Sequence, residues 1–119
     1  MANEHIKTAA MNLQRAVQDV RDAQKRLHGE IDNVKRENAR KIEAINRHIS
    51  QLEVKRIRKN FPSTGRVDIV AEERTLQSQI SIINRDTELY AAQREQEINM
   101  FEGQANHFQS LANQLNTIA

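Results

Sequence analysis

The chain has no cysteine and no tryptophan, and only one proline and three glycines among its 119 residues. Without cysteine, disulfide bonds and thiolate metal sites are excluded. Aromatic residues make up 3% of the chain and charged residues 29%, a balance that argues against a compact α/β enzyme and favours long exposed helices. No apolar run approaches the roughly 18 residues that a membrane-spanning helix requires. Residues 1–7 lack a charged-then-apolar leader, so we expect a cytoplasmic protein, with leaderless export as the alternative.

Apolar residues recur at every third or fourth position in both halves of the chain. This spacing averages near 3.5 residues, the period of a helix that keeps one face against a partner helix. The first half places them at Ile6, Ala10, Leu13, Val17, Val20, Leu27, Ile31, Val34, Ile42, Ile45, Ile49 and Leu52, and the second at Leu76, Ile80, Ile83, Tyr90, Ile98, Phe101, Ala105, Phe108, Ala112 and Leu115. Four polar residues fill the remaining steps of this seam: Gln24, Asn38, Thr87 and Arg94. We therefore predict a single all-α domain over 1–119, an antiparallel coiled-coil hairpin of two long helices.

The turn of this hairpin is predicted at 61–67, between helices of about 4–60 and 68–117. Pro62 disfavours helical geometry at Phe61, so the first helix should end near Asn60. Asp68 is the candidate N-cap of the second helix.

In each half, the seam residues are once separated by two consecutive steps of four residues. These interruptions of the spacing are centred on Asn38 and on Arg94. Folding the chain about residue 66 brings these two interruptions to one level, and with them several apolar and glycine pairs: Ile31 with Phe101, Leu27 with Ala105, Ile42 with Tyr90, Ile49 with Ile83, Leu52 with Ile80, and Gly29 with Gly103. A polar residue in a helical seam lowers stability and fixes the pairing register. We interpret Asn38 and Arg94 as register residues that hydrogen-bond to each other, rather than as a binding site.

A second group of apolar residues lies beside the seam of the second helix. Its members are Ile82, Leu89, Met100, Leu111 and Ile118. A broadened apolar face is typical of a helix with more than one neighbour, so we predict a homodimer that forms a four-helix bundle, or docking against the helices of another protein. The alternative is that these are ordinary apolar surface residues.

Charge is divided unevenly along the chain. Residues 1–60 contain 14 Lys and Arg against 8 Asp and Glu, whereas residues 61–119 contain 4 against 8. The strongest local cluster lies around the turn and comprises Lys55, Arg56, Arg58, Lys59 and Arg66. Basic residues at a helix C-terminus complement its dipole, which is one interpretation. The other is contact with an anionic partner, either nucleic acid, an anionic lipid surface or an acidic protein.

The sequence offers no catalytic motif, and we expect neither enzymatic activity nor a cofactor. The four histidines, His5, His28, His48 and His107, are isolated in sequence. His28 and His107 would lie near one level in the hairpin, yet no paired ligand motif on one helix supports a metal site. We interpret all four as surface residues.

These observations favour a structural or interaction module, an assembly subunit or adaptor, that works by helix-face docking and oligomerisation. A tip that binds nucleic acid or anionic lipid is the first alternative. The second is a small leaderless secreted protein, because the length and two-helix outline resemble the hairpin proteins of type VII export. The W-x-G turn of those proteins is absent here, since the chain has no tryptophan, so membership of that family is not inferred.

Overall fold

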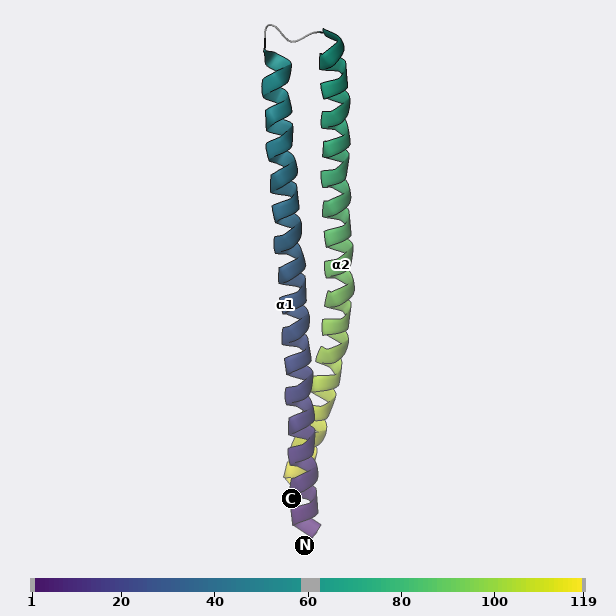
Figure 1. Cartoon of the computed structure of the whole chain (residues 1–119). Coiled ribbons are helices and arrows are strands. Elements are labelled where there is room, and N and C mark those ends of the chain that lie inside the picture. Colours follow the sequence, from purple (N-terminus) through teal and green to yellow (C-terminus); the bar gives the residue numbers. More distant parts are fainter. Residues whose placement is uncertain (1, 59–62, 119) are drawn as a thin grey trace. The chain divides into compact units, whose positions relative to one another are not determined.

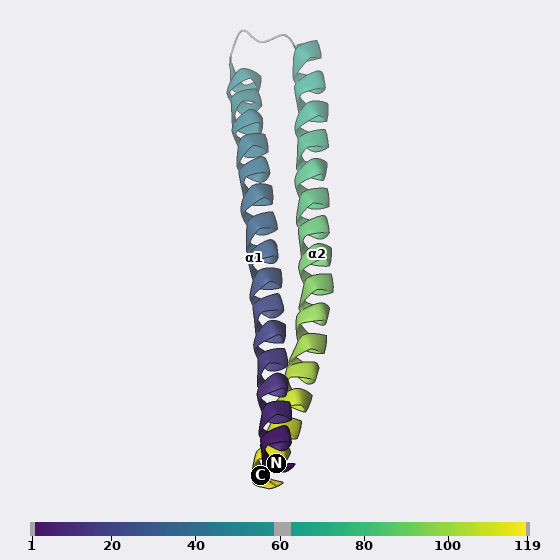
Figure 2. The ribbon, with the colours of Figure 1, turned by 60° about the horizontal axis from the view of Figure 1, so that its bottom comes forward.

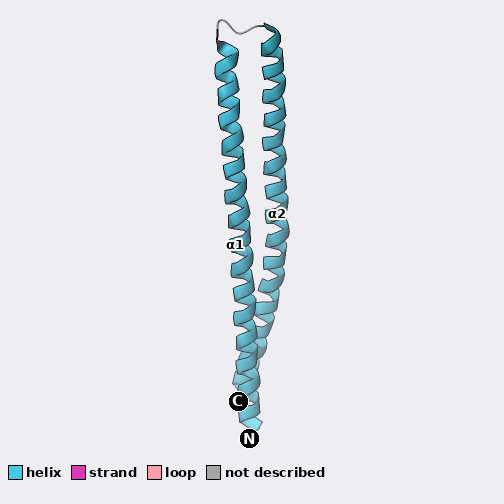
Figure 3. Ribbon diagram, viewed as in Figure 1, coloured by secondary structure: helices cyan, strands magenta, loops and turns pink. Residues whose placement is uncertain are grey.

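The computed structural model describes residues 2–58 and 63–118, and within these ranges it contains two long helices (Figure 1). Helix α1 spans Ala2–Ile57 and helix α2 spans Ser63–Ile118. The two helices run in opposite directions and pack against each other, which confirms the predicted all-α helical hairpin. Figure 3 shows that almost all of the described chain is helical.

Contacts divide the chain into two compact units. Unit 1 combines Met1–Ile31 with Ala91–Ala119, and unit 2 is the continuous segment Asp32–Tyr90. In unit 1 the beginning of α1 lies beside the end of α2 (Figure 2). Unit 2 contains the second half of α1 and the first half of α2, on either side of the turn.

Each unit has its own small apolar core along the seam between the helices. In unit 2, Ile49 and Leu52 of α1 pack with Ile69 and Leu76 of α2. In unit 1, Ile31 packs with Ala91 and Ile98, and half-buried Leu27 lies against them. Three alanines of unit 1 are almost inaccessible to solvent: Ala10, Ala105 and Ala112. Small side chains of this kind let two helices approach closely, which explains why alanine occupies seam positions here.

The turn is earlier and shorter than the sequence predicts. Helix α1 ends at Ile57 rather than near Asn60, and α2 begins at Ser63 rather than at 68. Asp68 therefore lies inside α2, and its prediction as the N-cap is wrong. Proline restricts the residue before it, whereas a helix can begin directly after it, which is the case at Ser63. Residues 59–62 lie outside the described part of the chain.

The earlier turn changes the pairing register of the helices. Folding about residue 66 pairs Asn38 with position 94, but its amide donates a hydrogen bond to Thr87, seven residues or about two turns earlier. Arg94 instead contacts Glu30 of α1. The predicted alignment of the two seam interruptions is therefore wrong, because it depended on a turn centred several residues too late.

Candidate interaction surfaces

The basic residues near the turn have different environments in the structure. Arg56 is half-buried, and its Nε lies 3.4 Å from a carboxylate oxygen of Glu73. The Glu73 side chain is only 10% exposed, so this ion pair links α1 to α2 inside the seam of unit 2. Arg56 thus has a structural partner already, which the sequence pattern did not indicate.

Other cations near the turn remain open to solvent. Arg66 is exposed, and its guanidinium donates a 3.3 Å hydrogen bond to the backbone carbonyl of Arg58, just beyond the end of α1. This bond satisfies a carbonyl that has no partner within the helix. Lys55 and Arg58 are also exposed. Lys59 belongs to the predicted cluster but lies outside the described residues.

Exposed aliphatic residues accompany these cations. Ile57 is 73% exposed and Val67 is 70% exposed. On α2 an open depression of about 370 Å³ is lined by Arg66, Val67, Val70, Ala71 and Arg74. We use the name tip patch for six residues of unit 2: Val54, Ile57, Arg66, Val67, Val70 and Arg74.

The tip patch lies on one side of unit 2. At about 100° per residue, Ile57 and Val54 are rotated from the seam residue Ile49 by about 80° and 140°. On α2, Val70 and Val67 are rotated from Ile69 in the same sense, by about 100° and 160°. In an antiparallel pair, rotation in the same sense brings residues of both helices to the same side.

The predicted oligomer face of α2 lies opposite the seam and divides between the two units. Ile82 and Leu89 belong to unit 2 and are both exposed. Met100 and Ile118 belong to unit 1 and are 69% and 67% exposed, whereas Leu111 is half-buried. In both units, therefore, large apolar side chains of α2 remain uncovered by α1.

The end of α2 has almost no charge. From Ile98 to Ala119 the sequence contains one charged side chain, Glu102, and seven Asn or Gln residues. Helical periodicity places three uncharged polar residues on the face of Met100, namely Gln96, Gln104 and His107. Glu97, three residues before Met100, also borders this face, and it is paired with Arg94 at 2.9 Å. The apolar side chains of this face therefore lie mainly among neutral polar groups.

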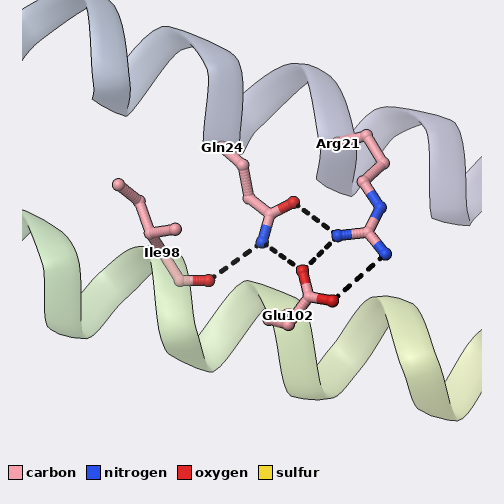
Figure 4. Close-up of polar contacts among 4 residues, drawn as sticks. All are labelled: Arg21, Gln24, Ile98 and Glu102. Atoms are coloured by element: carbon pink, nitrogen blue, oxygen red, sulfur yellow. Dashed lines mark hydrogen bonds and ion pairs between the residues drawn. The ribbon is translucent and has the colours of Figure 1, made fainter.

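Glu102 forms the main polar contact between the helices of unit 1 (Figure 4). Both of its carboxylate oxygens accept hydrogen bonds from the guanidinium of Arg21, and the bond to Oε1 is 3.3 Å long. The buried amide of Gln24 donates to Glu102 and to the backbone carbonyl of Ile98, each at 3.0 Å. Figure 4 shows the three side chains meeting between α1 and α2.

These hydrogen bonds also affect the acidity of Glu102. The Arg21 and then the Gln24 hydrogen bonds lower the pKa of the carboxyl group, and desolvation opposes them only in part. The sequence pattern placed Gln24 in the seam but gave no partner for it, because Glu102 lies next to a seam position and the predicted register was displaced.

The two predicted register residues both make polar contacts between helices. The Asn38 amide donates to the Thr87 hydroxyl at 2.6 Å, and that hydroxyl donates to the carbonyl of Ile83. The Arg94 guanidinium lies 3.9 Å from Glu30 and donates a 2.9 Å bond to Glu97. A role for either residue in fixing the register stays a prediction.

Two of the histidines each contact one neighbouring side chain. His48 lies 3.4 Å from Glu72, and the His107 ring is tilted against Phe108. Among residues 2–58 and 63–118, no group of three or more His, Asp or Glu side chains could hold a metal ion.

A Cβ atom added at Gly29 or Gly103 would meet nothing within 4 Å. Neither described helix is long and apolar enough to cross a membrane.

Comparison with protein-family models, with curated proteins and with solved structures finds no match to this chain. The functional argument therefore depends on the surfaces described above.

Proposed function

We propose that this protein is a non-enzymatic structural or interaction module that works by self-association through the outer face of α2. The observation that carries the proposal is the exposure of Met100 and Ile118 in unit 1, on the side of α2 turned away from α1. A helix that packs against one partner needs one apolar stripe, and a second stripe indicates a second neighbour.

The small cores of the hairpin support the same proposal. The buried larger apolar side chains retain 5–9% exposure, and only alanines fall to 1% or less among the described residues. Two helices side by side shield one narrow seam, whereas a four-helix bundle shields a central core from all sides. Association of two hairpins would bury apolar area that a single hairpin leaves in water.

A second copy of the chain is the partner that the charge distribution favours. In a two-fold symmetric dimer the same surface patch meets itself, so a patch of one charge sign would repel its copy. The face around Met100 largely avoids this penalty, because its neighbours Gln96 and Gln104 are neutral and able to donate and accept hydrogen bonds, and the charge of Glu97 beside it is paired with Arg94.

The molar mass in solution tests this proposal. We expect size-exclusion chromatography with light scattering to give a multiple of the chain mass of 13.7 kDa. Met100→Glu should shift the protein toward monomer, since a buried unpaired carboxylate is costly. Asn99→Glu is the matched control, because it adds the same charge one residue away and about 100° around the helix.

Two results would contradict the proposal. One is a monomeric wild-type protein at all concentrations. The other is an oligomer that Met100→Glu and Asn99→Glu weaken equally, which would indicate an effect of net charge and not of this face. Cytoplasmic location and leaderless export both stay predictions from sequence.

A further inference from the structure

We propose that the tip patch of unit 2 binds an anionic phospholipid surface. In this arrangement Ile57 and Val67 enter the headgroup region, and Arg66 and Arg74 contact lipid phosphates. The proposal concerns a different surface from the outer face of α2 around Met100, and it does not depend on self-association.

The first step of the argument is the charge near the turn. Residues 54–67 contain five Lys or Arg residues and no Asp or Glu. The nearest acidic residues of α2 are positioned elsewhere: Asp68 is rotated away from Val67 by about 100°, and Glu73 is held by Arg56 in the seam. Glu53 of α1 is exposed and lies one turn before Ile57 on the same side of α1, where it offsets part of this charge. Within the tip patch, Arg66 and Arg74 are exposed cations and no member is acidic, so the patch presents a positive potential that complements an anionic surface.

The second step is the presence of aliphatic side chains among these cations. Ile57 and Val67 are each at least 70% exposed, Val54 is 51% exposed, and half-buried Val70 lines the depression between Arg66 and Arg74. The free energy falls when aliphatic side chains leave water for the acyl boundary of a bilayer, while nearby Arg side chains bind the headgroups. Both components of interfacial binding are thus present on one side of the tip.

The same aliphatic residues distinguish a lipid surface from nucleic acid. Contact with a nucleic-acid backbone is made by cations and hydrogen-bond donors and depends on counterion release. Such contact gives no function to Ile57 or Val67. A lipid surface uses both the charge and the apolar side chains, which is why the geometry favours it.

Sedimentation with lipid vesicles tests the proposal directly. The full-length protein is mixed with vesicles of phosphatidylcholine alone, or of phosphatidylcholine with phosphatidylserine, and the bound fraction is measured. We expect binding to the anionic vesicles only. The double variant Ile57→Ser, Val67→Ser should weaken partitioning by about tenfold. Arg58 is an exposed cation one turn after Val54, beside the tip patch. The double variant Arg58→Gln, Arg74→Gln should weaken partitioning by about fivefold for each cation removed.

Matched controls separate this surface from other effects. Met11→Ser removes an apolar side chain of unit 1 that is 54% exposed, and it should bind vesicles as the wild type does. Met100→Glu should also bind, so that failure of the self-association proposal and failure of this one are distinguishable. Circular dichroism of every variant establishes that the helices are retained.

Three outcomes would overturn the proposal. The first is equal binding to neutral and anionic vesicles, or none to either. The second is unchanged vesicle binding by the Ile57→Ser, Val67→Ser variant. The third is retention of the wild type on duplex DNA without vesicle binding, lost on Arg58→Gln, Arg74→Gln and unaffected by the serine variant, which would make nucleic acid the partner.

Discussion

At the scale of single residues, the polar groups of the seam are not isolated interruptions but members of pairs that join the helices. Gln24 is buried, yet its amide nitrogen donates to Glu102 and to the Ile98 carbonyl. A buried amide without such acceptors would be strongly destabilising. Gln24 therefore favours the observed register, since moving α2 by one turn would remove both acceptors.

The first prediction concerns the acidity of Glu102. Because Arg21 and Gln24 stabilise the ionised carboxylate, the folded-state pKa lies below the unfolded one. The contribution is therefore fully present above the unfolded pKa of about 4.3 and is lost as pH falls through the folded value. We expect carboxyl-carbon NMR to show an upward shift in the Glu102 pKa in Arg21→Gln. In Glu102→Gln, acid unfolding should depend less steeply on pH below about 4.3.

Arg26→Gln provides the control for this measurement, since it removes the same type of charge from an exposed position of α1. If Arg26→Gln moves the Glu102 pKa as much as Arg21→Gln does, the shift comes from general charge and not from the hydrogen bonds.

The residue contacts show where sequence reasoning reaches its limit. The seam positions were predictable because helical periodicity alone determines which residues share a face. Leu52 and Leu76, both predicted for the seam, are buried in one cluster. Partners across the seam were not predictable, since they depend on where the turn begins. Because the turn around Pro62 was predicted a few residues too late, the predicted partner of Asn38 was Arg94, whereas the observed partner is Thr87.

At the scale of the helices, two glycines lie in the interiors of long helical segments. Gly29 is in α1 and Gly103 in α2. Glycine in a helix can allow another backbone to approach closely, because it has no Cβ atom. Within the hairpin nothing occupies the space of an added Cβ at either position, so packing inside the chain does not require glycine.

The second prediction follows from this open space. Gly29→Ala and Gly103→Ala should each raise the free energy of unfolding by about 0.5–1 kcal/mol, because alanine restricts the unfolded chain and favours the helix. Chemical denaturation of each variant measures the change. Ala92→Gly, at an exposed helical position, should lower stability by a similar amount.

A loss of stability in either alanine variant would contradict this expectation. If only the oligomer were destabilised, with the isolated hairpin stabilised, the glycine would mark a place where a second chain approaches closely. Unfolding at several protein concentrations separates these two cases.

At the scale of the whole molecule, the proposed self-association would couple to folding stability. A partner that binds only the folded chain raises its melting temperature in proportion to the logarithm of concentration. The dependence of melting temperature on concentration therefore tests assembly through the exposed apolar face of α2 around Met100, without purification of a complex.

The third prediction is therefore a melting temperature that rises with protein concentration. We expect the wild type, followed by circular dichroism, to melt several degrees higher after a hundredfold increase in concentration, since mass action then adds about 2.7 kcal/mol per hundredfold excess over Kd. In Met100→Glu the melting temperature should be independent of concentration. A wild-type melting temperature that does not change would indicate a hairpin that folds alone.

The division of the chain into units has a consequence for synthesis. Unit 2 is one continuous segment, whereas unit 1 joins Met1–Ile31 to Ala91–Ala119 across it. On the ribosome, the first part of α1 emerges before any of its partner has been made. At about 5–20 residues per second, it waits roughly 3–12 s while residues 32–90 are translated. During that interval the seam residues in the first part of α1 are open to chaperones and to other nascent chains, so the earlier segment of unit 1 stays unprotected until the later one follows.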